Sequence, residues 1–364
     1  MIPSAYFAPD YFSARRRFIA VAEARGARLA SYPIAALGPG GEPLSIDTAY
    51  IGPSRPTGLL IVLSGTHGVE GFMGSALQQL WLEKSQQVAL DRDAGCLLVH
   101  AVNPFGFAWQ RRTNENNVDI NRNALEQFPG PANPAYAQLN AWLNPPTPPR
   151  RLDFFWTRGA WLLLTQGLAS VKQATAGGQY QFPQSIFYGG ERLEASTARL
   201  AEILSDATFS AVERAVAIDL HTGLGRFATY RLLVDFAEGA PPYGEMVRWF
   251  GAAAVASNQP ERSIAYRVSG GLLGLIERAF PCAQTFPAVL EFGTVSLTRM
   301  IATLRRENRA YVHAAGSPAY TAARAALVDV FRPDHEAWQR RVLEQGVRVL
   351  AQGCRALEDR AAKP

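Results

Sequence analysis

The sequence predicts an α/β fold, in which a single domain is built on a mixed, mostly parallel central sheet with helices on both faces. The first observation is a set of four short apolar runs, which are typical of strands buried on both sides. These runs are residues 58–63, 96–102, 215–220 and 287–291. The second is that helical spacing of apolar residues separates them, as in the segment 72–82. The third is a composition of 48% hydrophobic and 18% charged residues, which is typical of a folded globular chain.

The remaining elements are predicted in chain order. Residues 11–28 carry apolar side chains at helical spacing, whereas 30–58 is rich in Gly and Pro and has short strand-like stretches. The chain from about residue 319 onward is again helical in pattern. The region of about 124–212 is less regular. We interpret it as a set of insertions on one domain spanning 1–364, because the strand patterns on both sides belong to one series.

The charge distribution argues against nucleic acid and membrane partners. The formal net charge is +5 and the pI is about 9.2, but the arginines are spread from end to end and form no basic run. The N-terminus lacks a signal-peptide pattern and no apolar run reaches 18 residues, so we expect a cytoplasmic protein. Its three cysteines contain no Cys-x-x-Cys pair, which predicts neither a disulfide framework nor a cysteine metal site.

Two of the five histidines follow predicted strands, where an α/β sheet binds its ligands. They are His67 and His221. Glu70 lies three residues after His67, and the glycines around it allow the tight turn that would bring both side chains to one point. Two histidines and a glutamate form a standard ligand set for catalytic zinc with a fourth position open. A His-x-x-Glu pair alone is also common at helix starts, so the second histidine strengthens the prediction.

Glu291 is predicted to end the last apolar run. A carboxylate at the end of a buried strand has an energetic cost unless it is paired or used. It could act as a general base beside a metal site, or it could pair with an arginine.

The polar segment 111–123 follows a predicted strand and an Asn-Pro turn. Arginine clamps carboxylates through paired hydrogen bonds or polarises a carbonyl group. Asn121 and Asn123 flank Arg122 and can orient a carboxylate through their amide donors. Considered in isolation, a solvated polar loop fits the segment equally well.

Together these motifs resemble the zinc metallocarboxypeptidase (M14-like) superfamily, which includes the succinylglutamate desuccinylase and aspartoacylase branch. The order is His-x-x-Glu, Asn-Pro-x-Gly at 103–106, an arginine, Asp-x-Asn-Arg-Asn at 119–123, a histidine and a glutamate. The sequence Asp219-Leu-His-Thr is especially similar to the desuccinylase branch, and the whole chain is similar to a bacterial group of the DUF2817 type. The resemblance implies a zinc carboxypeptidase or phosphorylase-hydrolase-like fold.

The resemblance also implies roles for residues at the matching positions. It implies one zinc ion held by His67, Glu70 and His221, and Glu291 as the base that activates water. It implies that Asn121 and Arg122 hold the substrate carboxylate.

Three further positions match the family less closely. Arg112, with Arg111 as its competitor, matches the arginine that polarises the scissile carbonyl and stabilises the oxyanion. Tyr266 is the best match for a tyrosine placed over the substrate. Asp219 matches a residue that supports a metal ligand.

We therefore predict a zinc-dependent, carboxypeptidase-like hydrolase that cleaves an amide bond next to a carboxylate, in a small peptide or an acyl amino acid. One alternative is an N-acyl amino acid deacylase of the desuccinylase or aspartoacylase type. Another is a non-catalytic metal-binding or ligand-binding module that kept the fold. The segment 177–190 could cap a small ligand, but its sequence fits a plain surface loop equally well. The sequence indicates no oligomeric state.

Overall fold

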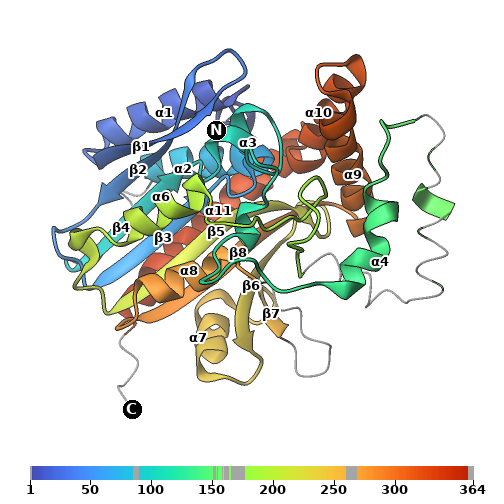
Figure 1. The fold of residues 1–364 in the computed structure, drawn as a ribbon. Helices are drawn as coiled ribbons and strands as arrows, with labels where there is room; N and C mark the ends of the chain where they lie inside the picture. Colours follow the sequence, from blue (N-terminus) through green and yellow to red (C-terminus); the bar gives the residue numbers. More distant parts are fainter. Residues whose placement is uncertain are drawn as a thin grey trace.

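A mixed eight-stranded sheet runs through the centre of the computed structural model (Figure 1). The structure describes residues 2–84, 90–150, 153, 155–157, 159, 164, 177–259 and 269–359, and the sheet is counted over these residues. The strand order is β1-β2-β4-β3-β5-β8-β6-β7. The strands are β1 (Arg28–Leu37), β2 (Pro43–Ile51), β3 (Gly58–Ser64), β4 (Ala94–His100), β5 (Arg214–Leu224), β6 (Tyr230–Ala237), β7 (Val255–Gln259) and β8 (Gln284–Val295).

Parallel pairing dominates the middle of the sheet. Strands β4, β3, β5 and β8 are parallel to their neighbours in that series, and β6 is parallel to β7. The β1–β2, β2–β4 and β6–β8 pairs are antiparallel. The predicted mixed, mostly parallel sheet is therefore confirmed. All residues of β3 and β4 are buried, as expected for apolar strands covered on both faces.

Helices cover both faces of the sheet (Figure 1). On one face a large apolar core joins the sheet to α1 (Tyr11–Ala24), α2 (Gly71–Lys84), α7 (Pro241–Phe250) and α11 (Glu336–Glu358). On the other face a second core joins it to α6 (Ala195–Leu204) and α8 (Leu272–Ala279). A third core lies beyond the carboxyl ends of β3 and β4. It is formed with α3 (Pro104–Ala108), α4 (Pro134–Leu143), α9 (Leu297–Ala314) and α10 (Pro318–Phe331).

Two predicted elements near the N-terminus differ from the structure. The helix predicted over 11–28 ends at Ala24, because Gly26 takes a left-handed conformation with φ of 67° and Arg28 already begins β1. The region 30–58 contains two long antiparallel strands rather than short stretches. Pro33 lies in β1, whose outer edge is unpaired within the described sheet, so its missing N–H is tolerated there.

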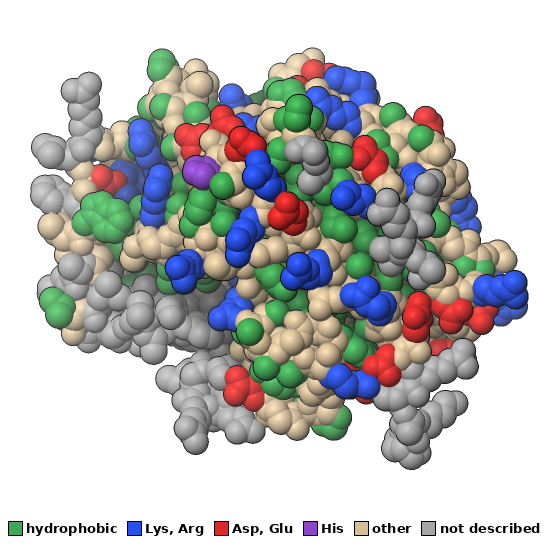
Figure 2. Space-filling model, turned by 180° about the vertical axis from the view of Figure 1, so that it is seen from behind, with side chains coloured by type: hydrophobic (Ala, Val, Ile, Leu, Met, Phe, Trp, Pro, Cys, Tyr) green, Lys and Arg blue, Asp and Glu red, His purple; other side chains and the backbone are tan. Residues whose placement is uncertain are grey.

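The charged surface is mixed. On the rear face, Lys and Arg side chains lie dispersed among acidic and apolar ones, with no continuous basic area (Figure 2). This matches the even spread of arginine along the sequence. Within the described part of the chain, no helix combines the length and the apolar character needed for a membrane crossing.

His100 is a buried histidine at the end of β4. Its Nε2 lies 2.9 Å from Ser75 Oγ, and its ring stacks on Phe18 with centroids 4.6 Å apart. Burial lowers the pKa of His100 to about 4. The unfolded chain has a histidine pKa of about 6.5, so between these values it binds more protons than the folded protein. Stability is therefore lost as the pH falls through this window.

We expect His100 alone to lower the free energy of unfolding by about 2 kcal/mol when the pH falls from 7 to 5. The measurement is urea unfolding at both pH values for the wild type and for His100→Gln, which keeps a polar partner for Ser75. The variant should lose about 2 kcal/mol less than the wild type over this interval. Equal pH dependence in the two proteins would contradict the assignment.

Candidate metal centre

The loop after β3 carries two of the predicted metal ligands. His67 caps the short 3-10 helix η2 (Gly68–Glu70), which leads directly into α2. Only glycine fits at position 68, because a Cβ there would overlap the backbone of Gly106 in α3. The amides of Gly68 and Val69 donate to the carbonyl oxygens of Arg112 (3.2 Å) and Arg111 (2.8 Å). The loop 65–70, which carries His67 and Glu70, is thereby fixed to the start of the polar segment 111–123.

His67, Glu70 and His221 converge on one point. His67 Nδ1 lies 2.9 Å from Glu70 Oε1, His221 Nδ1 lies 3.0 Å from Glu70 Oε2, and the two Nδ1 atoms are 3.1 Å apart. A tetrahedral zinc ion with bonds of about 2.0–2.1 Å separates its ligand atoms by about 3.3 Å. The three side chains are 2–4% exposed. Their donor types and spacing therefore fit a zinc ion.

Glu70 is held in place by backbone and charge. Its Oε2 accepts a hydrogen bond of 3.0 Å from the amide of Thr222. Burial by itself raises the pKa of Glu70, but the neighbouring His67 and His221 lower it overall, so the carboxylate stays ionised. An ionised carboxylate is the form that binds a metal.

Each histidine is oriented by a buried aspartate on its other ring nitrogen. His67 Nε2 lies 3.1 Å from Asp119 Oδ1, and His221 Nε2 lies 2.7 Å from Asp219 Oδ2. Asp219 in turn accepts a hydrogen bond of 2.8 Å from the Thr66 hydroxyl. Burial lowers the pKa of His221, but Asp219 and Glu70 raise it well above its usual value. These aspartates hold both Nδ1 atoms toward the point at which His67, Glu70 and His221 converge.

Asp119 is a residue that the sequence analysis missed. Its place in the motif 119–123 marked it as part of a polar loop, but the motif does not show that it reaches back to His67. Asp219 was expected near His221, and the structure places it there.

Glu291 and His221 lie side by side inside the sheet rather than at strand ends. The sequence predicted strands that stop at 220 and 291, but β5 and β8 continue and pair His221 with Glu291. The apolar runs stop earlier because polar residues and glycines interrupt them (His221, Thr222 and Gly223 in β5; Glu291, Gly293 and Thr294 in β8), while the backbone ladder continues. The length of an apolar run in the sequence therefore indicates where side chains are buried among apolar neighbours, but it does not give the length of the strand.

The carboxyl group of Glu291 is suited to proton transfer. Its Oε1 accepts a hydrogen bond of 2.8 Å from the amide of Leu224. Burial and the nearby Glu70 raise the pKa of Glu291 to about 7. A group with a pKa near neutrality can both accept and return a proton at physiological pH.

The structure separates the two adjacent arginines. Arg112 Nη1 lies 3.6 Å from Glu70 Oε1, and its Nε and Nη2 bind Asp119 Oδ2 at 3.1 and 3.0 Å. Arg111 is fully buried on the other side of the backbone and pairs with Glu307 at 2.8 Å. Arg112 is therefore the arginine that faces the metal ligands.

Arg122 is buried next to this group with part of its hydrogen-bonding capacity unused. It is 7% exposed, its Nη1 donates to the Asn121 carbonyl at 2.6 Å, and its buried Nε has no partner within the described residues. Gly178 packs on its stem, where a Cβ would come within 2.7 Å of Cδ. Burial lowers the pKa of Arg122, and the Asp119 carboxylate opposes that change. A buried guanidinium with an unused donor suits an anionic ligand.

Asn121 and Tyr266 are the other two residues predicted to bind substrate, and the structure describes only Asn121. Asn121 Oδ1 accepts a hydrogen bond of 3.0 Å from the amide of Leu272 at the start of α8, which leaves its amide nitrogen as the donor for a ligand. Tyr266 lies outside the described residues.

The segment 177–190 packs against the polar motif. Tyr188 O accepts from the amide of Asp119 at 2.7 Å, and the Tyr180 hydroxyl donates to Arg122 O at 2.6 Å. Phe187 is 5% exposed and lies 5.7 Å from the Arg112 guanidinium. The two ends of the segment, 178–180 and 185–190, are therefore buried beside the two site arginines, whereas its middle is exposed at Gln181, Pro183 and Gln184.

Solved structures similar to this chain include hydrolases. The succinylglutamate desuccinylase from Chromobacterium violaceum is 14% identical, with 88% of this chain and 74% of that chain covered and a TM-score of 0.37. The carboxypeptidase A from Helicoverpa armigera is 13% identical, with 87% and 74% covered and a TM-score of 0.44. The metallo-carboxypeptidase from Burkholderia cenocepacia is 12% identical, with 92% and 68% covered and a TM-score of 0.40. At these scores the chemistry has to rest on this chain's own side chains.

The family of the chain follows from a comparison with models of protein families. Among curated proteins no match was found. The model of the family described as "Protein of unknown function (DUF2817)" matches residues 7–345, which is nearly the whole chain. The DUF2817 resemblance inferred from the sequence is thus confirmed, and the chain belongs to the DUF2817 family.

Proposed function

We propose that this protein is a zinc-dependent hydrolase of the metallocarboxypeptidase type that cleaves an amide bond next to a carboxylate. The observation that carries the proposal is the convergence of His67, Glu70 and His221 at the spacing of zinc ligands. Glu291 lies beside His221 on the neighbouring strand. The ordered motifs in the sequence support the same class of enzyme.

A bound zinc ion would polarise the substrate carbonyl and make water a stronger nucleophile. Glu291 would accept a proton from the attacking water and deliver it to the amide nitrogen, so that the carbon–nitrogen bond breaks to give a carboxylic acid and an amine. Arg112 would stabilise the negative charge that develops on the carbonyl oxygen. Its bond to Asp119 keeps the guanidinium beside Glu70 before substrate arrives.

Arg122 and Asn121 would hold the substrate carboxylate. The Nε of Arg122 has no partner within the described residues and is a donor that an anion would satisfy, and Asn121 contributes an amide nitrogen. Binding through this pair would place the amide next to the carboxylate within reach of the metal centre.

A second candidate is hydrolysis of a small N-acyl amino acid. The observation that favours it is enclosure, because the proposed metal ligands are 2–4% exposed and the buried Tyr180 and Phe187 pack beside Arg122 and Arg112. A short acyl amino acid has an amide next to a carboxylate and needs less room than a peptide.

The test combines metal content with matched substrates. We expect purified protein supplied with zinc to hold about one equivalent by elemental analysis. We expect it to hydrolyse N-acyl amino acids or short peptides with a free carboxylate, and to hydrolyse their carboxamide counterparts poorly. Protein that takes up no zinc would refute the proposal, whereas equal rates on both members of each pair would refute the carboxylate requirement.

Arg122→Met is expected to raise KM for carboxylate substrates, because methionine keeps the apolar stem against Gly178 but removes the charge. A charge-assisted pair that is buried in the complex contributes about 2–3 kcal/mol, so kcat/KM should fall by about 30–150-fold. The measurement is steady-state kinetics on the free-acid and carboxamide substrates. The carboxamide rate should change little, and a parallel loss on both substrates would contradict the role.

A further inference from the structure

Arg111 forms the centre of a buried polar network on the side of the backbone away from the metal ligands. Its side chain is 0% exposed. Its Nε lies 2.8 Å from Glu307 Oε1, and its guanidinium lies 3.3 Å from the centre of the Tyr311 ring. Both partners belong to α9. Burying an arginine this completely requires that its charge be paired, and α9 supplies the pairing group.

The same guanidinium also holds the polar loop in its folded shape. Its Nη2 donates to Asn117 Oδ1 at 3.0 Å, and Asn117 has a left-handed backbone with φ of 59°. Arg111 therefore joins the beginning of the loop to its turn. The Asn117 amide nitrogen continues the network to the carbonyl oxygen of Pro183 at 2.9 Å.

This loop carries contacts on which the metal centre depends. The backbone carbonyl of Arg111 accepts from the amide of Val69 in the loop 65–70 at 2.8 Å. The next residue, Arg112, binds Asp119, and Asp119 holds His67 through Nε2. The path from α9 to a predicted zinc ligand thus runs from Glu307 to Arg111, along the backbone to Arg112, and through Asp119 to His67.

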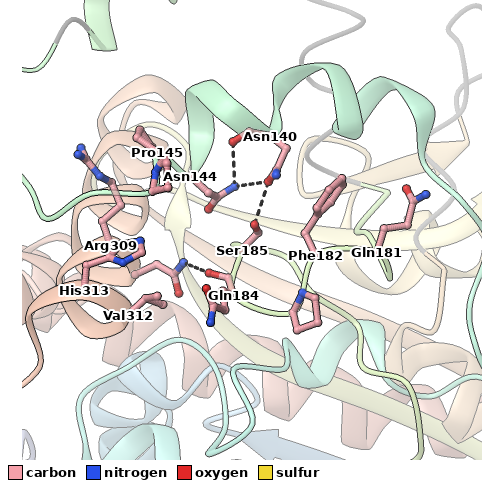
Figure 3. Close-up of a pocket in the computed structure, with 13 residues that line it drawn as sticks. Asn140, Asn144, Pro145, Gln181, Phe182, Gln184, Ser185, Arg309, Val312 and His313 are labelled. Carbon is pink, nitrogen blue, oxygen red and sulfur yellow. Dashed lines mark hydrogen bonds between the residues drawn. The ribbon is translucent and has the colours of Figure 1, made fainter.

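Polar contacts also surround Asn308, which lies between Arg111 and a cavity. A cavity of about 420 Å³ lies there between α4, α9 and the segment 181–185 (Figure 3). Asn140 Oδ1 accepts hydrogen bonds from Asn144 and Ser185 along one wall (Figure 3). Asn308 of α9 donates to Gln184 O at 2.8 Å and lies 3.4 Å from Arg111 Nη2. Helix α9 is therefore held by Arg111, through Glu307 and Asn308, and by the segment 181–185, through the bond from Asn308 to Gln184.

We propose that Arg111, through its pair with Glu307, is a positioning residue that anchors the metal centre to α9. It keeps the loop 111–119 in place, so that Asp119 orients His67 and Arg112 stays beside Glu70. This inference rests on the proposed zinc site, but it assigns a role to residues that contact neither metal nor substrate.

The test compares zinc dissociation constants measured by competition with a fluorescent chelator. The main variant is Arg111→Met with Glu307→Leu, which removes both members of the pair and leaves no unpaired buried charge. The matched control is Arg305→Met, which removes another buried arginine of α9 that pairs with Asp153 instead. We expect zinc binding to weaken about tenfold in the double variant and less than twofold in the control.

Kinetics and a conservative variant complete the test. The double variant should lower kcat more than it raises KM, because Arg112 would be misplaced while Arg122 is not. Arg111→Lys keeps the charge but loses the hydrogen bond to Asn117, so its zinc affinity should lie between those of the wild type and the double variant. If the double variant does not fold, the zinc affinity of Arg111→Lys provides the test. Wild-type affinity in the variants, or an equal loss in the Arg305→Met control, would overturn the inference alone. A wild type that binds no zinc would instead overturn the proposed function on which it rests.

Discussion

Replacing Glu291 by glutamine is expected to lower kcat for amide hydrolysis by about 10²–10⁴-fold. Glutamine can still accept the hydrogen bond from the amide of Leu224, so the strand and the pocket should keep their shape. It cannot accept a proton from water at neutral pH. The loss should therefore appear in kcat rather than in zinc content or in KM.

The measurement is steady-state kinetics with zinc content determined on the same samples. The pH dependence gives a second readout, because the active form of Glu291 is the ionised one. Burial and Glu70 raise its pKa to about 7, and a bound cation would lower it, so kcat/KM in the wild type should fall as the pH drops below a value at or under 7. That acid limb should be absent from the residual activity of Glu291→Gln. An unchanged kcat would rule out Glu291 as the base.

Replacing His221 by alanine is expected to weaken zinc binding by more than about 100-fold and to abolish hydrolysis. Loss of a group that merely supports a ligand already costs about 10–100-fold in affinity, and His221 supplies a ligand atom itself. The substitution also leaves Asp219 buried without its 2.7 Å partner, which adds a cost in stability.

Zinc titration and thermal unfolding separate these two effects. In the wild type zinc should raise the melting temperature, because a ligand that binds only the folded state stabilises it. In His221→Ala this rise should disappear. The exposed His313 provides a control, since His313→Ala should behave as the wild type does. Zinc-dependent stabilisation that persists in His221→Ala would place the metal elsewhere.

The central strands were predictable because continuous apolar runs are the direct signature of parallel strands buried on both faces. Where the strands end was not predictable. The runs are interrupted by polar residues and glycines, so hydropathy does not reveal that β5 continues to Leu224 and β8 to Val295. The pairing of His221 with Glu291 is consequently a property of register that only the folded sheet shows.

The site shows the same division between local and long-range information. Its candidate ligands stand out because histidine is scarce and the motifs occur in a recognisable order. Asp119 does not stand out, since its contact with His67 joins residues 52 positions apart. Neither does the choice between Arg111 and Arg112, because adjacent residues carry the same charge and only α9 decides which one is buried away from the site. Tyr266 stays a prediction.

His221, a proposed metal ligand, and Glu291, the proposed base, lie on neighbouring strands of the sheet. Adjacent strands are held about 4.8 Å apart by backbone hydrogen bonds, a spacing that surface substitutions do not alter. The groups proposed for carboxylate binding, in contrast, lie in the short 3-10 helix η4 (Ile120–Arg122) and are held by local contacts such as that of Asn121 with the amide of Leu272. We expect substitutions around η4 to change which acyl group or side chain is accepted, while the proposed ligand and base on β5 and β8 keep their places. Related proteins would in this way differ in substrate specificity while they share one proposed reaction.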